Sequence, residues 1–247
     1  MIKKIIIYLV AFIIIISIWE YYGKHSTNAR LLISSPSLIS QYIIDNFNSL
    51  STAMFTTFLE SFLGLILAVV FSFITMIICL LFPKVLDILL PVFISSQVVP
   101  LIALAPLLIL IFGLGLQAKI VMAALMCFFP LFINFLSGIS AIPTTIKELL
   151  FVYNASSYFK IFRISFPLSL PHIFTGLKIS ATLSVIGAIV AEFNGADVGL
   201  GKNLFLSAKR LEPELLMSSL LLSIILGGLM YLLIWAIENR IGKWYLT

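Results

Sequence analysis

KELLFVYNASSYFKIFRISFPLSLPHIFTGLKIS (residues 147–180) lies between two long apolar stretches and differs from both of them. It contains charged side chains, a polar run at residues 154–157 and two prolines, Pro167 and Pro171. Apolar side chains recur at helical spacing from Glu148 to Phe162, which predicts a helix there. Each proline lacks an amide hydrogen and crowds the preceding helical turn. We therefore expect a helix outside the membrane, a sharp bend at the prolines, and then a membrane span.

The whole chain has the composition of a membrane protein. Of its 247 residues, 62% are hydrophobic and only 10% are charged, and the mean hydropathy is +1.19. A soluble domain carries about a quarter charged residues and under half apolar ones. Apolar runs of about twenty residues recur, the length that a helix needs to cross about 30 Å of hydrocarbon. Because a segment in lipid must satisfy its own backbone hydrogen bonds, these runs predict an all-α, polytopic membrane protein.

We expect six membrane-spanning helices in a single transmembrane domain at residues 1–247, with a core at residues 54–238. Lys and Arg are in excess on one side of the membrane, nine against six, which places both termini in the cytoplasm. The first span is interpreted as a retained anchor rather than a signal peptide, because no A-x-A-like cleavage site follows Tyr22. The predicted spans are Ile5–Tyr22, Met54–Phe82, Ile88–Phe112, Ala118–Ile139, Phe174–Phe193 and Leu215–Ile237.

The polar region after the first span contains the stretch SPSLISQYIIDNF (residues 35–47). It begins with a Ser–Pro pair, which favours a helix start, and its apolar residues have helical spacing. We predict a short helix at the outer membrane interface, and a soluble linker is the alternative.

The sequence gives no indication of catalysis, a metal site or a cofactor. Cys79 and Cys127 lie inside apolar runs, where cysteine behaves as a small core residue. The two histidines, His25 and His172, lie outside the spans and do not pair with an intramembrane nucleophile. The formal charge of +5 is too small to indicate binding of nucleic acid. These residues argue against an enzyme.

The stretch GLGKNL (residues 199–204) is similar to a phosphate-binding loop at first sight. Such a loop needs a glycine five residues before the Gly-Lys pair and Ser or Thr after it. Ala196 and Asn203 occupy these two positions. We therefore expect no ATP binding by this route, so that energy for any active process must come from a separate subunit.

A longer pattern begins at Glu148. Permease subunits of binding-protein-dependent ATP-binding-cassette (ABC) importers carry a cytoplasmic signature of E-A-A, three residues, G, nine residues, I-x-L-P. This chain resembles that signature in spacing, with Asn154 at the glycine, Ile164 at the isoleucine and Phe166–Pro167 at the final pair; Pro171 is a second family-like proline. Leucines replace both alanines, which implies a differently shaped partner groove. Asparagine tolerates a left-handed backbone, so the turn at Asn154 is expected to persist.

Two other stretches resemble the nitrate, sulfonate and taurine subgroup of these permeases. They are ALAPLLILIFGLGLQAKI (residues 103–120) and IGAIVAEFNGADVGLGKNL (residues 186–204). The resemblance covers residues 55–235 in matching order. One departure is Glu60, because the subgroup usually has a basic residue at that place in the second span.

The resemblance implies a permease subunit of an ATP-driven importer in the bacterial cytoplasmic (inner) membrane, with a cytoplasmic coupling helix between the fourth and fifth spans. The implied partners are a second permease copy in a homodimer, two cytoplasmic ATP-binding subunits and an extracytoplasmic solute-binding protein, within membrane lipid. Nitrate, sulfonates, taurine and pyrimidine or flavin precursors of vitamins are the implied solutes. The residues that would couple to the ATPase are Glu148, Asn154, Ala155, Ser156, Ile164, Phe166, Pro167 and Pro171.

The third predicted span has a polar, broken region that is a candidate for the translocation path. Ser95, Ser96 and Gln97 precede Pro100 there. Broken helices typically line a cavity, because their freed backbone groups need partners. The alternative is a proline kink sealed by packing.

Glu192 and the nearby Asn194, at the end of the fifth predicted span, are further candidates for the path. An acid inside a membrane span costs about 2.5–3.5 kcal/mol at mid-depth and is typically functional. Three interpretations of Glu192 remain open. It faces the central pathway, it holds the outer loop through Lys202 or a partner chain, or it is solvated at the interface.

Two other functions remain open from the sequence. An ATP-independent channel or ion-coupled carrier would usually show internal repeats and several intramembrane ionisable groups. No repeat is visible, and Glu60 and Glu192 are the main ionisable candidates. A membrane scaffold that uses residues 147–180 only for docking is the third possibility.

Overall fold

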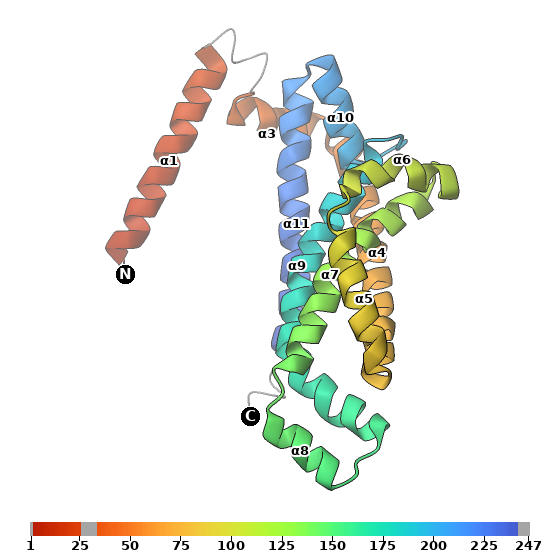
Figure 1. Ribbon diagram of the computed structural model, residues 1–247. Helices are drawn as coiled ribbons and strands as arrows, with labels where there is room; N and C mark the ends of the chain where they lie inside the picture. Colours follow the sequence, from red (N-terminus) through yellow and green to blue (C-terminus); the bar gives the residue numbers. More distant parts are fainter. Residues whose placement is uncertain (1, 26–33, 242–247) are drawn as a thin grey trace.

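The computed structural model describes residues 2–25 and 34–241, and its regular elements there are helices (Figure 1). The elements are α1 (Ile2–His25), α3 (Pro36–Asp45), α4 (Phe47–Leu81), α5 (Pro83–Ser96), α6 (Leu101–Phe112), α7 (Leu116–Ser140), α8 (Thr144–Val152), the π-helical segment η1 (Phe159–Ser165), α9 (Phe166–Glu192), α10 (Leu200–Arg210) and α11 (Pro213–Ile241). The all-helical class predicted from the sequence is confirmed.

Helix α7 is the centre of the bundle, with α4 and α9 packed along it (Figure 1). Small residues allow this close approach. A Cβ added at Gly187 of α9 would lie 2.7 Å from the Cα of Ala123, and one added at Gly64 of α4 would meet the Ala123 side chain. The Ser180 hydroxyl donates to the Cys127 carbonyl over 3.1 Å, and the Cys127 thiol donates to the Ser180 carbonyl over 3.1 Å. Small side chains and interhelical hydrogen bonds of this kind hold helices together in lipid, where the hydrophobic effect between them is absent.

Four helical runs are long and apolar enough to cross a membrane. They are Phe47–Leu81, Leu116–Ser140, Phe159–Glu192 and Pro213–Ile241. The pair α5 and α6 passes the same criteria together and is bent by 101° at residues 97–100, so it forms a broken span or a re-entrant loop. The second, fourth, fifth and sixth predicted spans are thus helices as expected, and the third is broken.

Helix α1 contains the first predicted span and stands apart from the bundle (Figure 1). It contacts the first turn of α3, because the Glu20 carboxylate accepts hydrogen bonds from the backbone amide and the hydroxyl of Ser37, at 3.0 and 2.6 Å. The Trp19 indole donates to the Ser34 carbonyl at 3.0 Å. The short helix predicted for residues 35–47 is α3, which packs Ile39 against the rest of the chain.

The predicted interruption of the helix at the two prolines is wrong, although the run changes direction where it leaves the bundle toward α8 (Figure 1). Residues Phe159–Glu192 form one helical run, with Pro167 in the first turn of α9 and Pro171 inside it. A proline in a first turn needs no amide partner. The wide π turn of η1 directly before Pro167 loosens the hydrogen-bond ladder where the ring would otherwise clash. The chain instead turns between α8 and η1, so the predicted continuous helix from Glu148 to Phe162 is also interrupted.

Candidate functional site

Helix α8, the turn at residues 153–156 and η1 form a projection that we call the elbow. The elbow lies at the opposite end of the bundle from α3 and α10 (Figure 1). The two predicted spans on either side of it, α7 and the η1–α9 run, are the helices that share the most extensive interface in the described chain. A displacement of the elbow would therefore act directly on the centre of the bundle.

The turn of the elbow has a defined hydrogen-bond geometry. Asn154 adopts a left-handed backbone with φ 47°, as expected for the residue at the signature's glycine position. The Asn154 amide donates to the Phe151 carbonyl at 3.0 Å, and the Ala155 amide donates to the Leu150 carbonyl at 3.1 Å. This pair of bonds is a Schellman motif that ends α8. The Ser156 hydroxyl then accepts the Phe159 amide at 3.3 Å and caps the following helix.

The remaining candidate coupling residues lie on both sides of this turn. Glu148 is exposed on α8, Ile164 lies in η1, and Phe166, Pro167 and Pro171 lie in the first turns of α9. The structure thus brings the signature's first half to the exposed elbow and its second half to the partly buried start of α9. Their role in coupling stays a prediction.

Sequence analysis did not single out the apolar tip of the elbow. Phe151, Val152 and Tyr153 are 81%, 78% and 75% exposed, and Tyr158 of the following helix is also exposed. Between α8 and η1 lies a hollow of about 320 Å³ lined in part by Lys147 and Lys160. Exposed apolar residues gathered in this way are typical of a surface that contacts another protein or the membrane. The apolar run of four residues at 149–152, beside polar neighbours, was the signal for it.

The broken third span places the polar candidates at its bend. Ser95, Ser96 and Gln97 end α5 and are exposed in the single chain. The Ser96 hydroxyl donates to the Phe93 carbonyl at 2.7 Å, which partly satisfies the helix end. The break is as predicted, and the path role of these residues stays a prediction.

A second polar cluster is buried where α4, α7 and α9 meet near α10. The side chain of Glu60 is inaccessible to solvent, and Glu192 is 1% exposed. Lys119 of α7 places its Nζ 2.9 Å from Glu60 Oε1. The Thr57 hydroxyl donates to Glu192 Oε1 at 2.7 Å. Glu192 is therefore buried, and its interpretation as a solvated interface residue is wrong.

Glu192 holds the loop between α9 and α10. Its Oε2 accepts the Gly201 amide at 2.5 Å, and the Leu200 amide donates to the Thr57 hydroxyl at 2.9 Å. Lys202, the expected partner, donates instead to the Asp197 carbonyl. Asn194 is exposed in the loop itself.

The glycines of GLGKNL explain this close contact. Gly199 has φ +150°, and a Cβ there would overlap the Glu192 carboxylate. A Cβ at Gly201 would lie 2.8 Å from Glu192 Oε2 and would also meet the Ile189 carbonyl. The sequence alone excluded a phosphate-binding loop here. The structure shows that the motif instead surrounds a carboxylate of the same chain.

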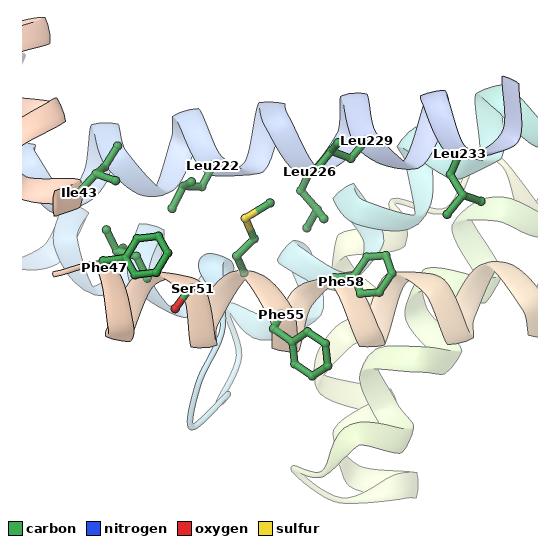
Figure 2. A pocket seen from close by; sticks show the side chains of 11 residues that line it. Ile43, Phe47, Ser51, Phe55, Phe58, Leu222, Leu226, Leu229 and Leu233 are labelled. Atoms are coloured by element: carbon green, nitrogen blue, oxygen red, sulfur yellow. The ribbon is translucent and has the colours of Figure 1, made fainter. Parts of the chain in front are cut away.

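An apolar groove runs between α4 and α11 on the side of the bundle (Figure 2). It has a volume of about 490 Å³. Leucines of α11 such as Leu222 and Leu226 point toward α4, where Phe47 and Phe58 face them (Figure 2). This lining gives a polar solute almost no partner, so the groove is no candidate for the translocation path.

The described helices define a polytopic membrane protein with a broken span, a buried polar cluster and an exposed apolar surface at one end. Residues 61–245 match the family described as "Binding-protein-dependent transport system inner membrane component". The chain belongs to this family, and it is a permease subunit of an ABC importer.

Similarities to individual proteins agree with this family assignment. The chain is 28% identical to a "Probable ABC transporter permease protein" of Haemophilus influenzae, over 88% of this chain and 89% of the relative. It is 33% identical to a formylaminopyrimidine transport permease protein of Halalkalibacterium halodurans, over 77% and 76%. It is 32% identical to a riboflavin transport system permease protein of Chloroflexus aurantiacus, over 62% and 58%. Further matches to permeases named for aliphatic sulfonates, taurine and nitrate place the chain in that subgroup, as a multi-pass inner membrane protein.

Proposed function

We propose that two copies of this chain form the transmembrane path of an ATP-driven importer and that the elbow is its coupling helix. A cytoplasmic ATP-binding subunit docks on each elbow, and an extracytoplasmic binding protein delivers the solute at the α10 end. In this arrangement α1 is the first of six spans in each copy, and both termini are cytoplasmic. The chain itself hydrolyses nothing.

The observation that carries this proposal is the exposed apolar tip of the elbow, at residues 151–153. A side chain of the partner can bind in the hollow between α8 and η1. Lys147 and Lys160, which help to line this hollow, suit an acidic group on that partner. The position of the signature supports the same assignment, because Glu148 and Asn154 lie on this surface.

The continuity of η1 and α9 supports a simple mechanism of transmission. The Schellman turn fixes α8 to the start of the following helix, and that helix continues without a break to Glu192. Closure of the ATP-binding subunits would push on α8 and move α9 against α7 and α4. The bundle then alternates between two states, which ATP and the loaded binding protein bias in opposite directions.

The test introduces a charge at the tip of the elbow. We expect Val152→Arg to reduce both the copurification of the ATP-binding subunit and ATP-driven uptake by about tenfold or more, because it buries an unpaired charge in the contact. Ile44→Arg is a matched control for copurification, because Ile44 is 74% exposed on α3 at the opposite end of the bundle (Figure 1). Normal uptake by Val152→Arg, or uptake that persists without ATP, would contradict the proposal.

For the solute, we propose an uncharged heterocycle of the pyrimidine or flavin class. Outside the elbow, which contains Lys160, two lysines in the described spans are buried or half-buried, and both are paired: Lys119 with Glu60 and Lys178 with Glu238 at 2.8 Å. An anion such as nitrate or a sulfonate would therefore meet no free buried ammonium group along these described helices between the two ends of the bundle. The relatives named for formylaminopyrimidine and riboflavin transport are consistent with this choice.

The solute proposal is tested with the reconstituted importer and its binding protein. We expect ATP-driven uptake of labelled formylaminopyrimidine or riboflavin, and none of labelled taurine or nitrate at the same concentration. Uptake of taurine or nitrate alone would overturn the choice of solute without affecting the assignment of the elbow.

A further inference from the structure

The buried cluster beside α10 contains more negative than positive charge. Glu60 on α4 and Glu192 on α9 are both buried there, Thr57 on the helical turn before Glu60 donates to Glu192, and Lys119 is the cation that contacts Glu60. Two carboxylates and one ammonium would leave a net charge of −1 in a region with almost no access to water. Such an uncompensated charge is very costly in a protein interior, and a carboxyl group normally avoids it by taking up a proton.

The hydrogen bonds show which carboxyl group lacks a donor. Both oxygens of Glu192 accept hydrogen bonds, from Thr57 and from the Gly201 amide. Neither oxygen of Glu60 receives a hydrogen bond from the described residues, although Oε1 lies beside the Lys119 ammonium. A proton on Glu60 that points toward Glu192 would satisfy the remaining oxygen and bring the cluster to zero charge.

We propose that Glu60 and Glu192 share one proton and that this proton site latches the α9–α10 loop onto α4. The bound ligand is H⁺ itself, held between two carboxyl groups with the Lys119 ammonium as the counter-charge. The loop is attached through the same cluster, because Glu192 accepts the Gly201 amide and Thr57 accepts the Leu200 amide. The site belongs to this chain and does not depend on which solute the importer carries.

The other charged groups on the described helices around the pair are exposed, as are Lys209, Arg210 and Arg240, or contact other groups. On the α10 side, Lys202 donates to the Asp197 carbonyl. On α11, Glu214 accepts the Ser34 hydroxyl at 2.7 Å and Glu238 pairs with Lys178. Lys119 on α7 is thus the charged group outside the pair that acts on it. The charge of the cluster is consequently set by one proton.

The direction of the pH effect follows from this charge count. At lower pH the shared proton is bound, the cluster is neutral and the loop is held. As the pH rises and the proton is lost, the two carboxylates repel and the latch weakens. Since the loop lies at the end where solute is proposed to enter, the latch would make the opening of that end sensitive to external pH.

The first experiment detects the shared proton directly, by infrared spectroscopy of the full-length chain in lipid vesicles. We expect the wild type at neutral pH to show the carbonyl stretch of a buried protonated carboxyl group. Both Glu60→Gln and Glu192→Gln should lose this band, because each leaves a single carboxylate that pairs with Lys119 or the loop. Glu238→Gln, which removes a carboxyl group from the other intramembrane ion pair, should retain it.

The second experiment measures the latch by hydrogen exchange at the Leu200 and Gly201 amides, as a protection factor corrected for the intrinsic rate at each pH. We expect protection in the wild type to fall by about tenfold or more from mildly acidic to mildly alkaline pH, because repulsion between the two ionised carboxylates displaces Glu192 and weakens the hydrogen bonds that hold the loop. Glu60→Gln should keep protection constant, because glutamine donates to Glu192 at every pH. These readouts do not require transport, so they fail independently of the importer assignment.

Three results would overturn the proposal. One is a wild-type spectrum without the protonated carboxyl band. Another is a band that survives in Glu192→Gln, because the proton would then belong to Glu60 alone. The last is protection of the two amides that changes with Na⁺ concentration instead of pH, which would make the site a cation site.

Discussion

Gly199 and Gly201 set how closely the loop before α10 approaches Glu192. Both positions are buried, and a side chain at either one would enter the space of the carboxylate. Gly199 also has a left-handed φ of +150°, which L-residues rarely adopt. A carboxylate that accepts backbone amides needs the backbone itself at hydrogen-bond distance. At the scale of the residue, the absence of two Cβ atoms is therefore what permits the cluster.

We predict that Gly201→Ala destabilises the protein by about 1–3 kcal/mol, the usual cost of overpacking a tight site. Thermal unfolding of the chain in lipid nanodiscs would measure this loss. Gly227→Ala is the matched control, because a Cβ there meets no atom within 4 Å and alanine favours a helix. Equal unfolding temperatures for the two variants would show that the cradle is not tight.

The run from η1 into α9 sets the direction of α8 and connects it to the bundle. Seven residues of π-helix, Phe159–Ser165, stand between the capped start of this run and Pro167. A π turn amounts to an α-helix with an additional residue, and it fixes the direction in which α8 projects from the bundle. It also lets two prolines lie in a continuous helix, which allows force on α8 to reach α9.

We predict that deletion of Phe162, an exposed residue of η1, converts the π turn into regular α-helix. The elbow would then rotate by about 100° relative to α9, the angle of one helical residue. ATP-driven uptake should fall strongly while membrane insertion and thermal stability change little. Phe162→Ala, which leaves the number of residues unchanged, is expected to retain uptake. Full activity of the deletion variant would mean that the direction of α8 is unimportant.

At the scale of the whole molecule, the two ends of the bundle differ in chemistry. One end carries the exposed elbow, and the other carries α3, α10 and the latched loop (Figure 1). The spans between them pack through small residues, and the groove between α4 and α11 opens on the side. Two ends of different chemistry suit a protein that binds a different kind of partner at each end.

We predict that the two ends lie on opposite sides of the membrane. Single cysteines at Ile44 and Tyr153 would report this, because both positions are highly exposed and the native Cys79 and Cys127 are buried. An impermeant thiol reagent should label Ile44→Cys from outside only and Tyr153→Cys from inside only, in sealed vesicles of known orientation. Labelling of both from the same side would exclude the proposed topology.

Local composition alone determined the all-helical membrane class, the position of most spans and the turn at Asn154. These features depend on neighbouring residues, since hydropathy is summed over some twenty positions and a left-handed backbone is a property of one residue. The resemblance drew attention to the segment that forms the elbow, and its coupling role stays a prediction. It did not reveal that the apolar tip at residues 151–153 is exposed.

Only the tertiary structure decided whether the prolines interrupt a helix and whether the buried acids lie together. Pro167 and Pro171 were predicted to break the helix because their local cost is certain, but the π turn before them absorbs that cost. Glu60, Lys119 and Glu192 are separated by about sixty and seventy residues in the sequence, and only the packing of α4, α7 and α9 brings them together. The charge of a buried site depends on every group that faces it, and those groups are set by contacts between distant parts of the chain.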